Sequence, residues 1–524
     1  MANHFLDLPS EILILIFHFL DLPSLIACIA TNRRVKSIIE GSALLQYRLA
    51  TQAACVEDNP CGDTTISIAR RLAALNERQT AFLELVPSSI RTIQMDDFPI
   101  LDTYALSGGI FVMTESPTKQ SLRWISLASI REQAPVWERL ELDEHILEFT
   151  LAVPEDDLLV VLSSTLSLDV HPPPSDAVLK LRFYEMSTGF AHRNAQDPVI
   201  IVPIAVTADP TFEVDICGPK VSLLMQRFDA PGPNRLLVYD WKKGQLQMDL
   251  ADEHSTAVFL SADSILLTNE RGGALELWTI PDVPERIAGP QISLKLPQLP
   301  NHHEYILGKV EYNPKGNHAL ASQRPFYSPL AHSVVILTID IMRYDVEDDP
   351  DSGVCLFIPR RALLEQTSAC ENHGEERLWA EWGPLISWWF STSSILLDEW
   401  PTIACGQRSV FLTPDRHILL LDFNPYTWKR TLLEQAQRKD STVVPATGQF
   451  DFGLSSKLNS VDEVASLGPL GEQTHSRLGC VAKLSLEPTT WDGVIMNEEW
   501  ILGIKVYVTF LQRPIDLDNT EYPE

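Results

Sequence analysis

Two short stretches of this sequence combine residue types that bind metal ions. Cys370-x-x-His373 has the spacing of two zinc ligands, but no second pair of matching geometry accompanies it, as a structural zinc site would need. His302-His303 is followed by Glu304, and the simpler interpretation of that triplet is an exposed loop with ordinarily titrating histidines. We therefore predict surface loops at both places, and no metal or cofactor.

A third stretch concentrates carboxylates. Asp345-Val-Glu-Asp-Asp-Pro-Asp-Ser-Gly353 has the composition of a cation-binding loop. Pro350 interrupts the ligand spacing of a calcium loop, however, and no bidentate Glu follows at the right place. We interpret the segment as a solvated insertion, with contact to a basic partner as the alternative.

Catalytic motifs are absent from the sequence. It holds no Gly-rich phosphate loop, no nucleophile elbow and no His-Glu-x-x-His motif. One stretch is rich in tryptophan, and large aromatic side chains dominate cores and interfaces alike. We expect these indoles to pack in a core rather than to form a binding patch: Trp379, Trp382, Trp388, Trp389 and Trp400. The sequence therefore predicts a protein that is not an enzyme.

Composition restricts the class of partner. The 524 residues include 41 Lys plus Arg against 70 Asp plus Glu, a formal net charge of −29. Such a field repels phosphate backbones and anionic surfaces, so binding to nucleic acid or to a membrane is not expected. The hydrophobic fraction of 45% is ordinary for globular proteins, and the length suits about two or three domains.

The cysteines and the apolar N-terminal run indicate the cellular compartment of the protein. The eight cysteines are scattered, which indicates reduced thiols because disulfide scaffolds are usually shorter and denser. The run from 12 to 17 follows no Lys or Arg and is interrupted by His18 and Asp21, so it suits neither a signal peptide nor a membrane span. We expect a soluble protein of the cytoplasm and/or nucleus.

Short helices are predicted over about the first fifty residues. Pro9 suits a first helical turn, Asp21 is a good N-cap for a second helix, and Thr31 or Asn32 can cap a third. Apolar side chains cover most of the first helix: Ile12, Ile16 and Phe19 on one face, with Leu13, Phe17 and Leu20 beside it. A helix that is apolar on most sides needs a buried central position or a protein partner.

The same residues carry a resemblance. The pattern runs Leu8-Pro9-x-Glu11-Ile12, Ile16-Phe17-x-x-Leu20, Leu25, Thr31-Asn-Arg-Arg34 and Ile38. It resembles the F-box motif, in the version common in large F-box families of mushroom-forming fungi. It departs at the end of the motif, where Trp is usual and this chain has Leu45 and Tyr47.

What the resemblance implies is binding to a Skp-type adaptor, which joins an F-box protein to a cullin scaffold and a ubiquitin-transfer enzyme. By motif position, seven residues would lie in or just under that interface: Leu8, Pro9, Ile12, Ile16, Phe17, Leu20 and Leu25. The alternative is a small three-helix domain packed on the rest of the chain.

The remaining chain divides into a linker and a β-rich domain. We predict an F-box domain over 1–50, a helical linker over 51–90 whose helix ends at Pro87, and a β-rich domain over 91–524. In the last of these, short runs of branched and aromatic residues alternate with Pro, Gly and Asp clusters, as in all-β domains. The expected fold class is α+β: a small N-terminal helical domain and then an all-β, propeller-like one.

A weak repeat supports the propeller. Strands that end in a turn recur about every forty to sixty residues, the scale of propeller blades with uneven loops. The copies are Phe183–Gly189, Val238–Gly244, Leu277–Asp282 and Leu421–Thr427, with Trp124–Leu127 as an earlier one. They resemble degenerate WD repeats, although Gly-His and Trp-Asp signatures are missing. About six or seven blades would fit, with an irregular β-sandwich array as the alternative.

Three functions remain open at this point. The F-box resemblance implies a substrate-recognition subunit of a Skp–cullin–F-box (SCF-type) ubiquitin ligase, in which the β domain captures an unknown protein. A second possibility is an adaptor-bound scaffold or regulator that has no ubiquitination target. The third is a propeller enzyme with a helical appendage.

Overall fold

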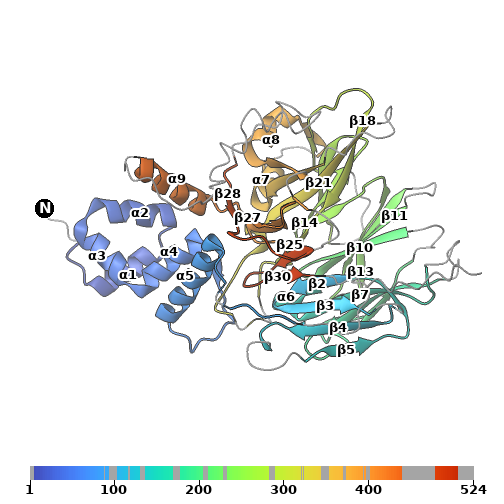
Figure 1. The fold of residues 1–524 in the computed structure, drawn as a ribbon, viewed down its shortest axis with the longest axis horizontal. Helices are drawn as coiled ribbons and strands as arrows, with labels where there is room; N and C mark the ends of the chain where they lie inside the picture. The colour runs from blue at the N-terminus through green and yellow to red at the C-terminus, as the bar shows by residue number, and fades with distance from the viewer. Residues whose placement is uncertain are drawn as a thin grey trace, which may run out of the picture.

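The structure is a computed structural model of the whole chain. It describes residues 5–87, 89–93, 103–115, 119–129, 136–168, 177–203, 210–227, 233–282, 289–319, 322, 324–343, 353–369, 373–392, 395–396, 402–439 and 478–505. Helices gather at the N-terminal end and stand off one side of a larger body of strands (Figure 1). None of the helices in these ranges is long and apolar enough to cross a membrane.

Four short helices form the N-terminal domain: α1 (Ser10–His18), α2 (Leu22–Thr31), α3 (Arg33–Gly41) and α4 (Ala43–Ala53). Polar side chains cap three of them, as the orphan amides of a helix start require. Asp21 accepts from the Ser24 amide at 3.0 Å, and Asn32 accepts from the Arg34 amide at 2.7 Å. Pro9 precedes α1 as its cap residue rather than lying in its first turn.

The core of this domain comes from one side of each helix. Its fully buried side chains are Leu13, Phe17, Leu25, Val35, Ile39 and Leu45. Leu13 and Phe17 are four residues apart, so they lie on the same face of α1. The helical period therefore sends one apolar face of α1 inward and leaves the other outside.

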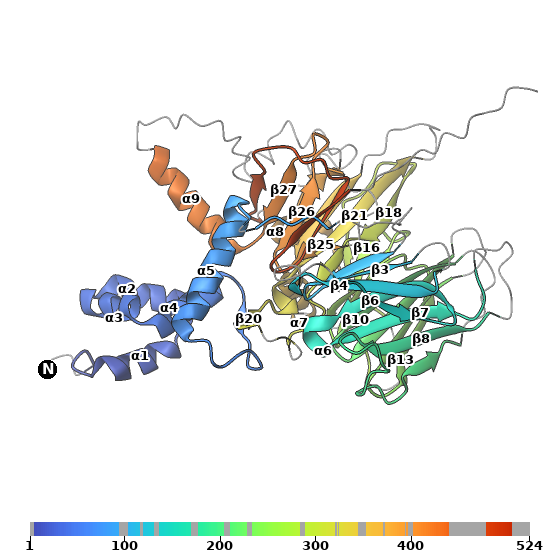
Figure 2. The same cartoon turned by 60° about the horizontal axis from the view of Figure 1, so that its bottom comes forward.

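A helical linker connects this domain to the strands. Its helix α5 (Ile68–Glu84) begins at the cap Ser67 and ends before Leu85, which adopts a left-handed conformation with φ of 51°. Figure 2 shows α5 lying between α1–α4 and the strand-rich body. Before it, β1 (Glu57–Asp58) pairs antiparallel with β20 (Phe326–Tyr327), a strand that follows it by more than two hundred residues.

Over the described residues, six sheets of four or five strands succeed one another, and we call them blades 1 to 6. Blade 1 contains β2 (Tyr104–Ser107), β3 (Ile110–Thr114), β4 (Ser121–Ser126) and β5 (Glu138–Glu141). Blade 2 contains β6 (His145–Ala152), β7 (Leu158–Ser164), β8 (Leu179–Glu185) and β9 (Val199–Ile201). Blade 3 contains β10 (Pro210–Cys217), β11 (Lys220–Arg227), β12 (Asn234–Asp240) and β13 (Gln245–Asp252). Each is an antiparallel meander, and the turn after β6 includes the short helix α6 (Val153–Asp156).

Blades 4 to 6 add strands from distant segments. Blade 4 contains β14 (Ala257–Ser261), β15 (Ser264–Asn269), β16 (Ala274–Thr279) and β17 (Ile292–Lys295), with β23 (Glu375–Arg377) added in parallel. Blade 5 contains β18 (His303–Lys309), β21 (Val334–Arg343), β22 (Val354–Pro359) and β24 (Trp388–Ser391). Blade 6 contains β25 (Thr402–Cys405), β26 (Arg408–Leu412), β27 (Ile418–Asp422) and β28 (Val481–Leu484), and β19 (Glu311–Asn313) pairs in parallel with β25. Further helices are η2 (Leu330–His332), α7 (Arg360–Ser368), α8 (Trp379–Ile386) and α9 (Pro425–Lys439).

A two-stranded sheet joins the last blade to the first. It consists of β29 (Gly493–Met496) and β30 (Ile501–Ile504). Val494 and Met496 pack with residues of blade 6, whereas Ile495 and Ile504 pack with residues of blade 1. Alternate side chains of a strand point to opposite faces, so this sheet fills the gap between the two blades. The ring is therefore a six-bladed propeller closed by a narrow wedge.

The predicted repeat corresponds to one strand in five of the six blades, and none of its copies falls in blade 5. Phe183, Val238 and Leu277 are fully buried on the third strands of blades 2, 3 and 4, and Leu421 is fully buried on β27. Trp124 lies on β4, the third strand of blade 1. The propeller prediction is thus confirmed, and the sandwich alternative is excluded.

The tryptophan-rich stretch packs inside blade 5 and beside it, as predicted. Trp379 and Trp382 of α8 and Trp388 and Trp389 of β24 are at most 7% exposed. Trp400, Cys370 and residues 345–352 lie outside the described residues. The turn before β18 holds His302, which is exposed with a positive φ of 68°, whereas His303 and Glu304 lie on β18 itself, so the loop predicted for this triplet is wrong for its last two residues.

Candidate functional site

Several large apolar side chains of α1 and α2 are exposed. We call this set the α1–α2 apolar face, and its members are Ile12 (42% exposed), Leu15 (55%), Ile16 (38%), Phe19 (83%) and Ile26 (53%). Ile12, Ile16 and Phe19 follow the spacing of one helix face, on a different side from the buried Leu13 and Phe17. Large apolar side chains left in water in such number on one small domain are characteristic of an interaction site.

The seven residues given by motif position divide into three environments. Ile12, Ile16 and Pro9 are exposed, Leu8 and Leu20 are half-buried against the helical core, and Phe17 and Leu25 are fully buried in that core. The last two therefore lie under the face and shape it from inside. Phe5 stacks edge-on against Phe17, with ring centroids 6.2 Å apart.

Leu15, Phe19 and Ile26 were not among the predicted site residues, although all three belong to the exposed face. Leu15 and Phe19 lie three and seven residues after Ile12, so helical spacing alone could have found them. Ile26 lies on α2, so the spacing of residues along α1 carries no information about it. The guanidinium of Arg34 adds one hydrogen bond to the residues before α1: its Nη2 donates to the carbonyl of Leu8 at 3.4 Å.

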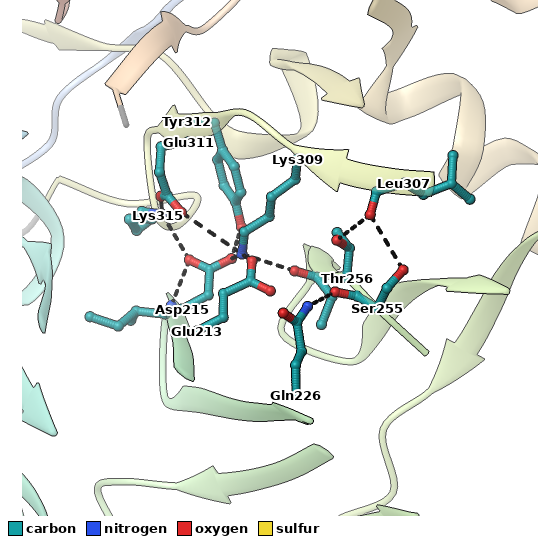
Figure 3. Close-up of polar contacts among 12 residues, drawn as sticks. Glu213, Asp215, Gln226, Ser255, Thr256, Leu307, Lys309, Glu311, Tyr312 and Lys315 are labelled. Carbon is teal, nitrogen blue, oxygen red and sulfur yellow. Dashed lines mark hydrogen bonds and ion pairs between the residues drawn. The ribbon is translucent and has the colours of Figure 1, made fainter. Parts of the chain in front are cut away.

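A second cluster of interest lies inside the propeller, and Figure 3 shows its contacts. The Nζ of Lys315 lies 2.7 Å from Oδ1 of Asp215 and 3.0 Å from Oε2 of Glu311, while the Tyr312 hydroxyl donates to Asp215 at 2.7 Å. Lys309 pairs with Glu213 and lies 3.8 Å from Asp215. We call these residues the central polar cluster.

Charge pairing accounts for the protonation of this cluster. Burial alone would lower the pKa of Lys315, but Asp215 and Glu311 raise it above its ordinary value. Burial lowers the pKa of Lys309 to about 8. Buried charges that pair with each other and with hydrogen-bond donors are tolerated in a protein interior. Because Asp215 belongs to blade 3, Lys309 to blade 5 and Glu311 to the strand added to blade 6, the cluster connects three blades.

A lysine with a perturbed pKa can also indicate a catalytic site. The lysines and carboxylates of the central polar cluster are engaged with one another, which is the arrangement of a structural ion network. Across the described ranges, no three His, Cys, Asp or Glu side chains come together in a way that could hold a metal ion.

Hydrogen bonds between the helical linker and the propeller hold in place the domain that bears the α1–α2 apolar face. The side-chain amide of Asn59 donates to the carbonyls of Ala319, Ser322 and Arg324, at 3.3, 2.9 and 2.9 Å. Near the other end of the junction, the Asn424 amide donates to the Ala53 carbonyl at 2.8 Å. Asn59 is only 2% exposed, so the linker is built into the propeller at this point.

Comparison with known proteins identifies the N-terminal helices. The family model described as F-box-like matches residues 5–51, which contain α1 to α4 almost entirely. No curated protein matches the chain.

Solved structures similar to the chain are distant. An uncharacterized protein, lmo1340 of Listeria monocytogenes, is 8% identical, with 61% of this chain and 78% of that chain covered and a TM-score of 0.30. The β-propeller domain of the Trilobed protease from Pyrococcus furiosus is 8% identical, with 63% and 90% covered and a TM-score of 0.27. Hsv2 of Kluyveromyces lactis is 11% identical, with 49% and 85% covered and a TM-score of 0.22. At such scores the likeness carries no argument, so the propeller assignment rests on the order of the sheets.

Proposed function

We propose that this chain, in which an F-box-like domain at residues 5–51 precedes a six-bladed β-propeller, is a substrate-recognition subunit of an SCF-type ubiquitin ligase. The F-box-like domain binds a Skp-type adaptor and, through it, a cullin. The propeller binds a protein substrate. The chain itself is not an enzyme, because the ubiquitin chemistry belongs to other subunits.

The observation that carries this proposal is the α1–α2 apolar face. Phe19 is 83% exposed and Leu15 is 55% exposed, next to Ile12 and Ile16, on a domain with its own complete core. Removing such side chains from water contributes roughly 25 cal/mol per Å² of apolar surface buried. A partner with a matching apolar groove would therefore gain affinity from this face.

The way the two domains are joined supports the same function. A substrate held on the propeller is carried at a fixed offset from the α1–α2 apolar face, because Asn59 and Asn424 anchor the linker. Ubiquitin transfer then benefits from a high effective concentration of the target lysine near the transfer enzyme. An adaptor-bound scaffold without ubiquitination targets would use the same face and remains the second candidate.

Partner classes and location follow from charge and thiols. The net charge of −29 disfavours nucleic acid and anionic membranes as partners of this function. The seven cysteines in the described part of the chain are all free, which suits the reducing cytoplasm and/or nucleus.

Adaptor binding by purified full-length chains tests the proposal. We expect Ile16→Asp and Phe19→Asp to weaken binding to a recombinant Skp-type adaptor by several kcal/mol, because each places a charge in an apolar contact. Phe17→Asp is unsuitable, since Phe17 is buried and its replacement would unfold the domain.

Lys36→Glu is the matched control. Lys36 lies on α3 with its side chain 53% exposed, in an i,i+4 pair with Glu40, and an exposed pair contributes under about 1 kcal/mol. Binding should be measured by isothermal titration calorimetry. Equal losses in the control and in the two apolar variants, or undiminished binding by Phe19→Asp, would contradict this assignment of the interface.

A further inference from the structure

A small cavity lies at the junction between the helical linker and the propeller. It has a volume of about 30 Å³, room for roughly two or three waters or one small anion. Cys55 and Arg78 line it from the helical side, and Gln407, Arg408, Asn497 and Glu498 line it from the propeller. Its walls therefore belong to two domains.

Most of the charges around this cavity are already paired. The Nε of Arg408 lies 3.0 Å from Oδ2 of Asp422, and Nη1 of Arg324 lies 3.2 Å from Oε2 of Glu498. Arg78 differs, because no carboxylate of the described residues lies within ion-pair distance of it, and its Nε is buried without a hydrogen-bond partner. Its guanidinium stacks 4.5 Å above the ring of Phe326 instead. Burial lowers the pKa of Arg78 to about 10, and the nearby charge of Arg408 adds to that effect.

Asn497 supplies a second unpartnered donor. The residue is fully buried, and its Oδ1 accepts from the amides of Glu499 and Trp500 at 3.0 and 2.9 Å. These two bonds fix the orientation of the amide group and leave its Nδ2 without a partner. Gln407 adds an unpartnered acceptor, its Oε1. Among the groups that line the cavity, two buried donors, one of them cationic, and one acceptor have no partner, whereas the charges of Arg408, Asp422 and Glu498 are paired.

We propose that this cavity binds a small oxyanion that retains one proton, of the phosphate type. Arg78 Nε and Asn497 Nδ2 would donate to its charged oxygens, and its hydroxyl would donate to Gln407 Oε1. Charge-assisted hydrogen bonds of this kind would satisfy the buried Nε of Arg78, which no carboxylate of the described residues reaches within ion-pair distance. A free phosphate and a phosphate monoester of a metabolite share this chemistry. The proposal is independent of adaptor binding.

A ligand held here contacts α5 and the propeller at once. It would therefore bind the docked arrangement of the two domains more tightly than an undocked one, and it would stabilise the junction by mass action. The oxyanion would thereby help to fix the angle at which the F-box-like domain leaves the propeller.

Calorimetric titration of the full-length chain with inorganic phosphate, at constant ionic strength, tests the site. We expect saturable binding at pH 7, and a loss of affinity of about tenfold or more for Arg78→Met, which keeps an apolar stem over Phe326. Arg70→Met is the matched control, because Arg70 is an exposed residue of the same helix and should leave the affinity unchanged. Acetate, which has no hydroxyl to donate, should bind more weakly, and glycerol phosphate distinguishes the monoester from the free anion.

Asn497→Asp is the second variant, in case Arg78→Met fails to fold. It keeps the oxygen that accepts from Glu499 and Trp500 and replaces the unpartnered donor by an anionic oxygen, so phosphate binding should be lost, and a thermal melt without phosphate shows that the variant chain is folded. The proposal would be overturned by absence of saturable binding at phosphate concentrations up to about 10 millimolar, which would detect even weak binding. Equal affinity of the wild type and a folded Arg78→Met or Asn497→Asp chain would overturn it as well.

Discussion

At the scale of single residues, α1 shows how side chains of the same kind acquire different roles. Phe17 and Phe19 are two residues apart, yet one is 2% exposed and the other 83% exposed. The helical period of 3.6 residues sends them to different faces. Phe17 builds the domain, and Phe19 is left free for the partner that we propose. An apolar sequence pattern alone does not distinguish these roles, but the position of each residue on the helix does.

Glu155 shows how burial changes the chemistry of a carboxyl group. It lies in α6, is 4% exposed, and its Oε1 accepts from the Lys315 amide at 2.9 Å while its Oε2 has no partner. Burial raises its pKa to about 8, and the negative charges of Glu498 and Asp156 contribute to the rise. At neutral pH the folded protein therefore holds this side chain in its protonated form.

The stability of the propeller should consequently depend on Glu155 and pH. Between an unfolded pKa of about 4.5 and a folded pKa of about 8, the folded chain keeps a proton that the unfolded chain has lost. The free energy of unfolding therefore decreases as the pH rises through this window. Glu155→Gln cannot ionise and should remove the decrease. We expect similar thermal midpoints for the two chains at pH 5. At pH 8 we expect a higher midpoint for the variant, because its free energy of unfolding exceeds that of the wild type by an amount on the order of a few kcal/mol. A variant with the pH profile of the wild type would show that Glu155 ionises freely in the folded state.

At the scale of elements, the buried side-chain amide of Asn59 makes several of the hydrogen bonds of the junction between the linker and the propeller. Asn59 donates to three carbonyls of the propeller segment 319–324, and its own backbone amide donates to the carbonyl of Pro325 at 2.9 Å. The pairing of β1 with β20 continues this contact. Replacing the side chain leaves buried acceptors without a donor, which is a recognised cause of large destabilisation.

We therefore expect Asn59→Ala to loosen the junction without unfolding either domain. The cost should be about 1–3 kcal/mol, the penalty for unsatisfied buried polar groups. Faster cleavage in limited proteolysis between residues 51 and 67, and a broader distance distribution between spin labels on α3 and on blade 1, would report the change. Asn76→Ala on the exposed side of α5 is the control. An unchanged distance distribution in Asn59→Ala would assign the rigidity of the junction to other contacts.

Several elements could be predicted from the sequence because their signals are local. The caps Asp21 and Asn32, the two faces of α1 and the third strands of the blades each depend on a few neighbouring residues. The added strands β19 and β23 could not be predicted, since each pairs in parallel with a segment more than eighty residues away. The contact between Glu155 and Lys315 joins residues 160 positions apart. Such pairings depend on the closed ring, which the sequence indicates only as a weak repeat.

At the scale of the whole molecule, the propeller ring is closed by the short sheet of β29 and β30. This sheet is far in sequence from blade 1, where the ring begins. The wedge of β29 and β30 packs Ile495 and Ile504 against Tyr104 and Leu106 of blade 1. The same wedge packs Val494 and Met496 against blade 6. A propeller without such closure exposes apolar sheet faces at its open edges, and these are liable to aggregate.

Truncation tests whether this closure holds the propeller together. A chain that ends at Glu498 lacks β30, and we expect it to lose cooperative unfolding and to aggregate, because β29 is left without its partner strand and Ile504 is removed from the apolar contact with blade 1. A chain that ends at Lys505 retains both strands and is the matched control, with an expected thermal midpoint close to that of the full chain. Calorimetry and light scattering at the same protein concentration would compare the three. If the chain ending at Glu498 stays monomeric and as heat-resistant as the control, β30 is dispensable, and closure of the ring would need only β29, whose Ile495 packs with blade 1 and whose Val494 and Met496 pack with blade 6.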